Sequence, residues 1–214
     1  LGNIRISSDG DLYNSAFIIQ NKVIVGFQDK SLLPSYDVFD EKRYFNHAVN
    51  IDPIKIKICE TNISIGLQIC EDMWDQDYPV KVAKELYDKG ANIIINISAS
   101  PFHCDKVVDR KNIIECQISK FPIPFLYCNL IGGQDEIIFD GQSLCFNSEG
   151  DLIAIGKAFS EDLIEFDLDD NNTVKFSLND KESQLYNALK LGVKDYFRKT
   201  GFSQAVIGLS GGID

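Results

Sequence analysis

The sequence contains few of the residues that build metal sites and has no long apolar run. It has only two histidines in 214 residues, and none of its six cysteines belongs to a CxxC pair. Structural zinc sites use four cysteine or histidine ligands, usually at paired spacings, so we expect no metal site. A membrane-spanning helix needs roughly 18 consecutive apolar residues, and no run of that length occurs.

Positive charge is also scarce. The chain has 21 Lys and Arg against 32 Asp and Glu, a net charge of -11. An acidic surface repels phosphate backbones, so we expect no nucleic-acid partner, although backbone N–H groups can still bind one phosphate locally. Nothing resembles a signal peptide, and the chain is long enough to fold without disulfides. We therefore expect reduced, mostly buried cysteines in a cytoplasmic protein.

Apolar segments alternate between strand spacing and helix spacing along the first 168 residues. We expect strands at residues 16–19, 23–25, 54–58, 63–69, 91–97, 125–130, 142–146, 152–155 and 165–168. We expect helices at residues 80–89 and 110–120, which end at a glycine and before a proline. Strands that alternate with helices and then form hairpins indicate an α/β domain with a mixed sheet.

The C-terminal part has a different composition. A polar stretch at residues 167–172 predicts a linker. A helix at residues 182–199 follows, with Leu185, Leu189, Val193 and Tyr196 on one apolar face, and then a strand at 205–209. We therefore divide the chain into a domain at 1–168, a linker at 169–181 and the beginning of a second domain at 182–214. Because the chain opens without Met and stops within what looks like a functional loop, we expect a fragment.

Cys70 is the first candidate for catalysis, because it directly follows a buried strand and precedes Glu71 and Asp72. Strand ends in α/β sheets are where reactive groups are displayed. A single cysteine after an apolar run is more often a core residue, and two carboxylates raise a thiol pKa. A nucleophilic Cys70 therefore needs a cationic partner, and Lys30 in its apolar, aromatic loop is the candidate.

Four stretches together resemble the nitrilase superfamily and, within it, glutamine-dependent NAD synthetases. They are residues 30–45 (KSLLPSYDVFDEKRYF), 70–74 (CEDMW), 96–102 (NISASPF) with Lys106 and Arg110, and 132–141 (GGQDEIIFDG). The resemblance covers the first two thirds of the chain in the family's order. It implies a nitrilase-type α-β-β-α sandwich of mixed sheets flanked by helices.

The resemblance assigns roles to individual residues. Cys70 would attack the side-chain amide of glutamine, and Lys30 would stabilise the tetrahedral intermediate, helped by the backbone N–H of Glu71. The positions matching the glutamine site are Tyr36, Glu71, Trp74, Ser100 and Lys106. Ser98 is an alternative to Ser100, and His103 is expected to make local contacts only.

The resemblance also has a gap. The family's general base is a glutamate upstream of the stretch matching residues 9–15, and residues 1–8 contain no glutamate. Glu41 matches a second, supporting position, so the catalytic set in this chain is Cys70, Lys30 and Glu41. We therefore expect the chain alone to be incomplete and inactive, through truncation or through loss of the glutamate.

The last motif follows the expected strand at 205–209. It resembles the SGGxD loop of ATP-pyrophosphatases, whose free N–H groups hold a pyrophosphate. The predicted ATP-binding residues are Gly208, Leu209, Ser210, Gly211, Gly212, Ile213 and Asp214. Residues 182–214 would then be the first helix and strand of a Rossmann-like synthetase domain.

The sequence therefore predicts a glutamine-dependent NAD synthetase. The amidase domain would release ammonia, which would amidate nicotinic acid adenine dinucleotide with ATP and Mg²⁺. We expect glutamine, ATP and the acid dinucleotide as partners and a homo-oligomer as the assembly. Two alternatives remain: a stand-alone nitrilase-type amidase acting on another small amide, and a degenerate, non-catalytic amidase-like domain.

Overall fold

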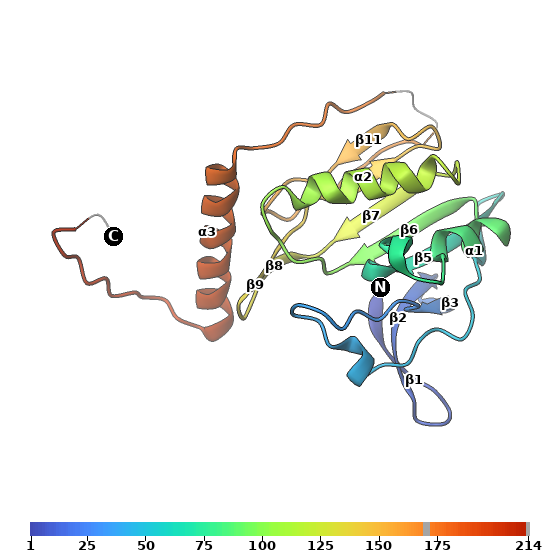
Figure 1. The fold of residues 1–214 in the computed structure, drawn as a ribbon, viewed down its shortest axis with the longest axis horizontal. Coiled ribbons are helices and arrows are strands. Elements are labelled where there is room, and N and C mark those ends of the chain that lie inside the picture. The colour runs from blue at the N-terminus through green and yellow to red at the C-terminus, as the bar shows by residue number, and fades with distance from the viewer. Residues whose placement is uncertain (169–171, 213–214) are drawn as a thin grey trace.

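The computed structural model describes residues 1–168 and 172–212. Two sheets pack face to face in the main body (Figure 1). The smaller sheet has the order β1 (Gly2–Ile6), β2 (Leu12–Gln20) and β3 (Val23–Asp29), with all pairs antiparallel. The β2–β3 hairpin confirms the predicted strands at 16–19 and 23–25.

The larger sheet has six strands in the order β11-β10-β7-β6-β5-β4. Its strands are β4 (Ile54–Ile58), β5 (Thr61–Ile69), β6 (Ile93–Ser98), β7 (Phe125–Asn129), β10 (Leu144–Phe146) and β11 (Leu152–Ile155). Strands β5, β6 and β7 are parallel to one another, and the other pairs are antiparallel. The predicted α/β class with a mixed sheet is confirmed.

Helices cover the outer face of the six-stranded sheet. α1 (Val82–Asp88) and α2 (Lys106–Ile118) lie across it, and their apolar sides form the main core with the sheet (Figure 1). On the inner face, Ala16 of β2 packs against Ile65, Leu67 and Ile69 of β5. The helix predicted from residue 110 begins four residues earlier, at Lys106.

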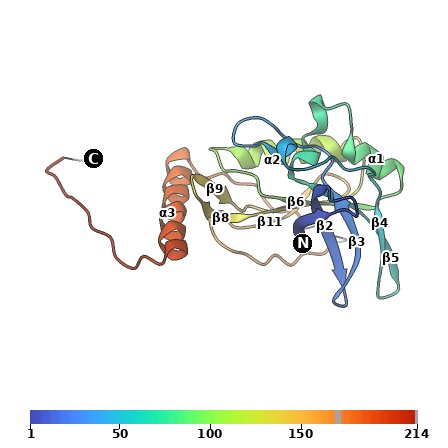
Figure 2. The same cartoon turned by 90° about the horizontal axis from the view of Figure 1, so that it is seen from below.

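Three short 3₁₀ helices lie in the loops: η1 (Glu41–Arg43), η2 (Cys70–Met73) and η3 (Asp75–Asp77). A hairpin of β8 (Ile131–Gln134) and β9 (Ile137–Asp140) extends from the body, and α3 (Lys181–Thr200) lies against it (Figures 1 and 2). The matching stretch at 132–141 therefore forms most of a β-hairpin.

The existence of α3 was predicted correctly, but its buried face was not. The expected apolar stripe is exposed, with Leu189 at 65% and Val193 at 61% of their full accessible surface. The face toward the hairpin instead presents Ala188, Gly192 and Asp195. Two backbones approach closely there, since a Cβ added at Gly133 would lie 3.0 Å from Gly192 Cα.

Two predicted strands and one cysteine expectation are wrong. Residues 165–168 and 205–209 form no strand, and residues 205–209 are exposed coil. Of residues 165–168, Leu168 packs against two apolar clusters of the sheet. All six cysteines are free as expected, but only Cys145 is buried, and Cys59 and Cys128 are exposed.

Of the predicted linker, residues 169–171 lie outside the described part of the chain, and the boundaries of the two domains stay a prediction. No helix in the described part of the chain combines the length and apolarity needed to cross a bilayer.

Candidate active site

The candidate site lies where three parallel strands end. Cys70 follows β5, Ser98 ends β6 and Asn129 ends β7. The register pairs Ile69 with Ile97 and Ser98 with Asn129, so these ends meet at one edge of the sheet. Carboxyl ends of neighbouring parallel strands are where α/β proteins place their reactive groups.

Cys70 has a strained backbone. Its φ of 46° lies in the left-handed region, which a cysteine rarely adopts and which costs on the order of 1–3 kcal/mol. Neighbouring groups stabilise this backbone conformation: Asn96 Nδ2 donates a hydrogen bond to Cys70 O at 3.3 Å, and η2 begins at Cys70 itself. The turn places Glu71 in the first turn of η2, where an N–H has no carbonyl partner within the helix.

Lys30 lies just beyond β3 and is 2% exposed. Its Nζ donates to Glu41 Oε1 at 2.5 Å, and Asn14 Nδ2 donates to the other Glu41 oxygen at 3.4 Å. A buried ammonium without a carboxylate would be costly, so Glu41 supplies the opposite charge that Lys30 needs in this position.

Asp72 joins the lysine loop to the cysteine turn. One carboxylate oxygen accepts the N–H groups of Ser31 and Leu32 at 3.0 and 2.8 Å, and the other accepts from Ile69 at 2.9 Å. Complete burial raises the pKa of Asp72 to about 7, against the opposing effect of these three N–H donors. Sequence reasoning missed this role, although a carboxylate two residues after the cysteine was visible.

The Cys70 thiol is protonated in the resting site. Burial raises its pKa, while the Lys30 ammonium and a hydrogen bond with Ser98 oppose that rise, and the charges of Glu71 and Glu41 add to it. The expected cationic neighbour is therefore present but does not by itself produce a thiolate. A base must remove the proton when a substrate binds.

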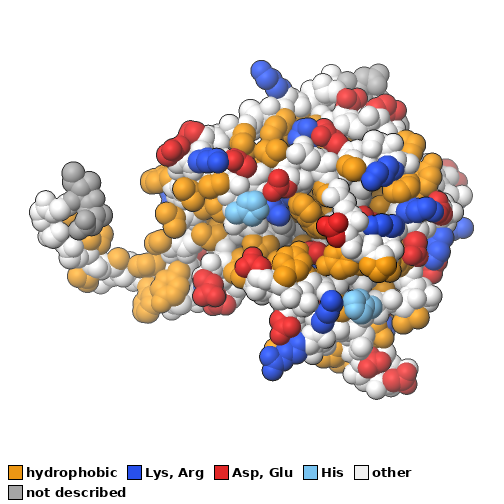
Figure 3. Space-filling view, viewed as in Figure 1, with side chains coloured by type: hydrophobic (Ala, Val, Ile, Leu, Met, Phe, Trp, Pro, Cys, Tyr) orange, Lys and Arg blue, Asp and Glu red, His pale blue; other side chains and the backbone are white. Residues whose placement is uncertain are grey.

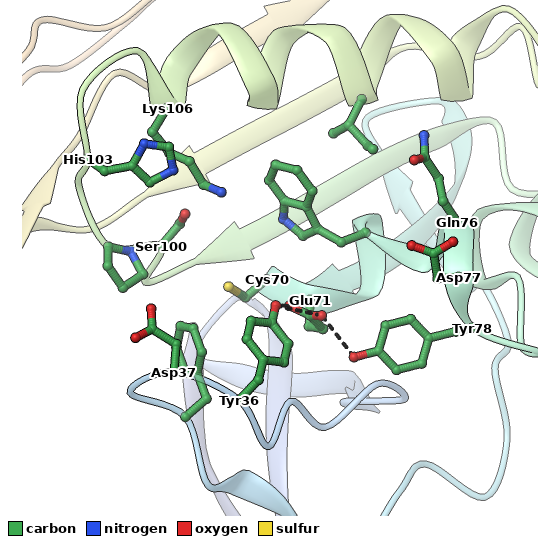
Figure 4. Close-up of a pocket in the computed structure, with 14 residues that line it drawn as sticks. Tyr36, Asp37, Cys70, Glu71, Gln76, Asp77, Tyr78, Ser100, His103 and Lys106 are labelled. Atoms are coloured by element: carbon green, nitrogen blue, oxygen red, sulfur yellow. Dashed lines mark hydrogen bonds between the residues drawn. The ribbon is translucent and has the colours of Figure 1, made fainter.

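A cavity of about 550 Å³ opens above Cys70 (Figure 4). Its wall includes Glu71, whose carboxylate accepts hydrogen bonds from Tyr36 at 2.9 and 3.0 Å and from Tyr78 at 2.9 Å. Burial and the adjacent Glu71 carboxylate raise the pKa of Tyr78 to about 12, so this phenol stays protonated. Asp37 and Asp77 also line the cavity.

The opposite wall is cationic. The Lys106 ammonium lies 4.2 Å from the centre of the Trp74 ring, and both residues line the cavity with His103 (Figure 4). Burial lowers the pKa of Lys106. The cavity thus has carboxylates at one end, an ammonium at the other and a thiol between them, as expected for binding a small zwitterion.

Ser100 lines the cavity, and Arg110 and Asn129 fix the position of its loop. Arg110, fully buried, forms two 2.9 Å hydrogen bonds with the Asp140 carboxylate and donates to Ser100 O and Oγ at 3.0 and 3.2 Å. Asn129 Oδ1 also accepts a hydrogen bond from the backbone N–H of Ser100 at 2.9 Å. Ser98 Oγ instead donates to Asn96 at 2.6 Å. The pairing of Arg110 with Asp140 across 30 residues left no signal in the sequence.

The structure therefore brings all the predicted amidase residues to one place. Tyr36, Glu71, Trp74, Ser100 and Lys106 line the cavity with Cys70, and Lys30 and Glu41 lie beside the lysine loop that Asp72 joins to the cysteine turn. The ATP-binding candidates at 208–212 are exposed, and Ile213 and Asp214 fall outside the described residues. No group of His, Cys, Asp and Glu in the described ranges could hold a metal ion. The ATP-binding role of residues 208–214 stays a prediction.

Comparison with known proteins gives consistent results. The family described as carbon-nitrogen hydrolase matches residues 2–176. Curated relatives include the glutamine-dependent NAD(+) synthetases of Synechocystis sp., 41% identical over 95% of this chain, and of Thermotoga maritima, 36% identical over 98%. The chain spans 38% and 42% of the length of these two relatives.

Solved structures agree with this result. Glutamine-dependent NAD+ synthetase from Acinetobacter baumannii, in complex with ADP, superposes with a TM-score of 0.82 at 29% identity, covering 94% of this chain and 38% of that one. A carbon-nitrogen hydrolase from Helicobacter pylori superposes with a TM-score of 0.63 at 25% identity, covering 75% and 58%.

Proposed function

The chain belongs to the carbon–nitrogen hydrolase family, and on that basis we propose that its cavity hydrolyses the side-chain amide of glutamine through Cys70. The observation that carries the proposal is the strained Cys70 at the floor of a cavity that is anionic on one side and cationic on the other. Glutamine is a zwitterion whose ammonium suits Glu71 and whose carboxylate suits Lys106.

In the proposed reaction, the Cys70 sulfur attacks the amide carbon as its proton passes to a base. The C–N bond then breaks, and ammonia leaves with the proton. Water hydrolyses the resulting thioester to glutamate and restores the thiol. Lys30 stabilises the oxyanion together with the N–H of Glu71, in the manner of an oxyanion hole. Glu41 holds Lys30 in place through the hydrogen bond to its Nζ.

The test is to trap the thioester. The whole protein that contains this chain is mixed with glutamine and quenched in acid, and its Cys70 peptide is examined by mass spectrometry. Isobutyramide serves as a matched small amide that lacks both charged groups. We expect acylation of Cys70 by glutamine only. Equal acylation by isobutyramide would support the alternative of an amidase with another substrate, and no acylation by either amide would support a non-catalytic domain.

A second measurement concerns the proton acceptor. We propose slow ammonia release by this chain, because Glu41 is engaged with Lys30 and the thiol pKa is raised. In Glu41→Gln the hydrogen bond to Lys30 is kept and the charge is lost, so we expect about a tenfold decrease in acylation rate. A loss of about ten-thousandfold would instead identify Glu41 as the general base.

We further propose that the protein containing this chain is a glutamine-dependent NAD synthetase. It would use ammonia, ATP and Mg²⁺ to amidate nicotinic acid adenine dinucleotide, and it would be a cytoplasmic homo-oligomer. The 41% and 36% identical relatives support this proposal. In the whole protein, Cys70→Ala should abolish NAD formation from glutamine and preserve it from ammonium. Loss with both nitrogen sources would contradict the separation of the two reactions.

A further inference from the structure

The polar side of α3 contacts the rim of the cavity directly. Gln184, 6% exposed, accepts a hydrogen bond from the backbone N–H of Asp105 at 3.0 Å. Its Nε2 donates to Asp105 Oδ1 at 3.1 Å and to Asn179 O at 2.7 Å. Lys181 Nζ adds an ion pair with the other Asp105 oxygen at 3.3 Å.

Asp105 is the residue that determines how α2 begins. It has φ 67° and ψ 7°, a left-handed conformation that aspartate tolerates better than most residues but that still needs support. Its side chain makes no capping hydrogen bond to α2 itself. The support comes instead from Gln184, which is 79 residues away in the sequence and binds both the backbone and the carboxylate.

Lys106 is the next residue and the first of α2, so the backbone conformation of Asp105 sets the direction in which the Lys106 side chain enters the cavity. Its ammonium lies over the Trp74 ring on the cationic wall. A change in the backbone angles of Asp105 would reorient Lys106, the first residue of α2. The flexible Lys106 side chain would then leave its position over the Trp74 ring. We propose that Gln184 of α3 is a positioning residue for Lys106 and thereby sets the affinity of the cavity for the carboxylate end of its substrate.

This proposal rests on the proposed function only for the identity of the substrate. The positioning itself can be read without any ligand, because Trp74 is the only tryptophan in the chain and lies in contact with the Lys106 ammonium. Trp74 emission therefore reports on Lys106 directly, and glutamine titration reports separately on binding.

The experiment compares wild type, Gln184→Ala, Lys106→Ala and the double variant. Leu185→Ala is the matched control, since Leu185 is the next residue of α3 and is 48% exposed. Without ligand, we expect Gln184→Ala to shift Trp74 emission in the same direction as Lys106→Ala, and Leu185→Ala to leave it unchanged. Circular dichroism checks that α3 is retained.

With glutamine, we expect Gln184→Ala to weaken the apparent Kd about tenfold, and the double variant to bind no more weakly than Lys106→Ala alone. That non-additivity distinguishes positioning from general stabilisation. Asp105→Gly, which keeps the left-handed backbone and removes the carboxylate, should lie between wild type and Gln184→Ala.

Wild-type emission in Gln184→Ala would overturn the proposal, and so would fully additive losses in the double variant. Failure of the wild type to bind glutamine, with the emission shifts intact, would count against the proposed substrate and leave the positioning role supported.

Discussion

The cavity region and α3 differ in which side chains they bury. Around Cys70 the buried groups are charged and paired: Lys30 with Glu41, Arg110 with Asp140, and Asp72 with three N–H donors. α3 buries small and polar residues and leaves its leucines and tyrosines in solvent, and Figure 3 shows apolar side chains gathered on that side of the molecule.

The difference shows that two sequence motifs can look equally informative although only one of them is surrounded by the residues that fix its geometry. The buried charges of Lys30, Arg110 and Asp72 each have their counterparts within the same fold, so the motif of residues 70–74 becomes a site with defined geometry. The glycine-rich motif at 208–212 has no such counterparts in the described part of the chain. A motif indicates chemistry only where the surrounding residues fix its backbone.

The largest effect should come from breaking a pair beside Cys70. Lys30→Ala removes the buried ammonium and leaves Glu41 without its ion-pair partner. We expect acylation of Cys70 by glutamine to become at least about a hundredfold slower. Quenched-flow mass spectrometry measures the rate, and Lys57→Ala, an exposed lysine, is the control. A decrease of less than about tenfold would place Lys30 outside the reaction.

A second prediction tests the contact between α3 and the hairpin. Gly133→Ala places a Cβ 3.0 Å from Gly192 Cα, where only backbone movement can relieve the clash. We expect a loss of about 1–3 kcal/mol in the stability of the α3 contact, seen as faster hydrogen exchange along α3. Gly208→Ala has open space and should be neutral. Unchanged hydrogen exchange along α3 in Gly133→Ala would show that the hairpin accommodates the added Cβ without destabilising the α3 contact.

A third prediction concerns pH and Asp72. Its folded pKa of about 7 lies above the ordinary value of 3.8, so the folded state holds the proton more tightly than the unfolded chain. This contribution is complete below the unfolded pKa and is lost as pH rises through about 7, with a slope of at most about 1.4 kcal/mol per pH unit.

Asp72→Asn should remove that slope. The slope is measured from urea unfolding midpoints at pH values between 3.8 and about 7. Asp11→Asn, at an exposed position, should show the same slope as wild type. An identical slope in wild type and Asp72→Asn would mean that Asp72 is already ionised in the folded state throughout this range.

The smallest effect is expected at the C-terminal end. Removing residues 203–214 should change the free energy of unfolding by less than about 0.5 kcal/mol, because every described residue of that segment is exposed. Thermal unfolding of both chains provides the measurement. A larger destabilisation would reveal that the segment packs against the body in solution.

The sequence predicted the elements whose signal is local. The apolar run of β6 and the alternation of Lys55 and Lys57 in β4 identified strands. The strand before Cys70 was likewise visible, whereas the other cavity residues were named through the resemblance to the nitrilase superfamily. These features depend on spacing along a few residues, and the sequence contains that information.

The features that sequence reasoning missed depend on distant partners. The buried face of α3 is decided by the close approach of Gly133 and Gly192 and by Asp195, whose Oδ2 accepts from Gly133 N at 2.9 Å. The β8–β9 hairpin contains two glycines and a polar turn, which resemble a loop locally. Residues 165–168 alternate like a strand, but the structure assigns no strand there.

The parallel order of β5, β6 and β7 also determines when the thiol becomes reactive during folding. Parallel neighbours can pair only after the helix that joins them has crossed over, so contacts between Cys70, Ser100 and Asn129 close two long loops of chain. A nascent chain that has formed β5 but lacks β7 carries Cys70 as an ordinary thiol in a flexible turn, without its oriented surroundings. The surroundings that would let Cys70 attack a bound amide are therefore completed late, together with the tertiary structure. A partly folded chain should be no more reactive toward electrophilic metabolites than a free cysteine peptide.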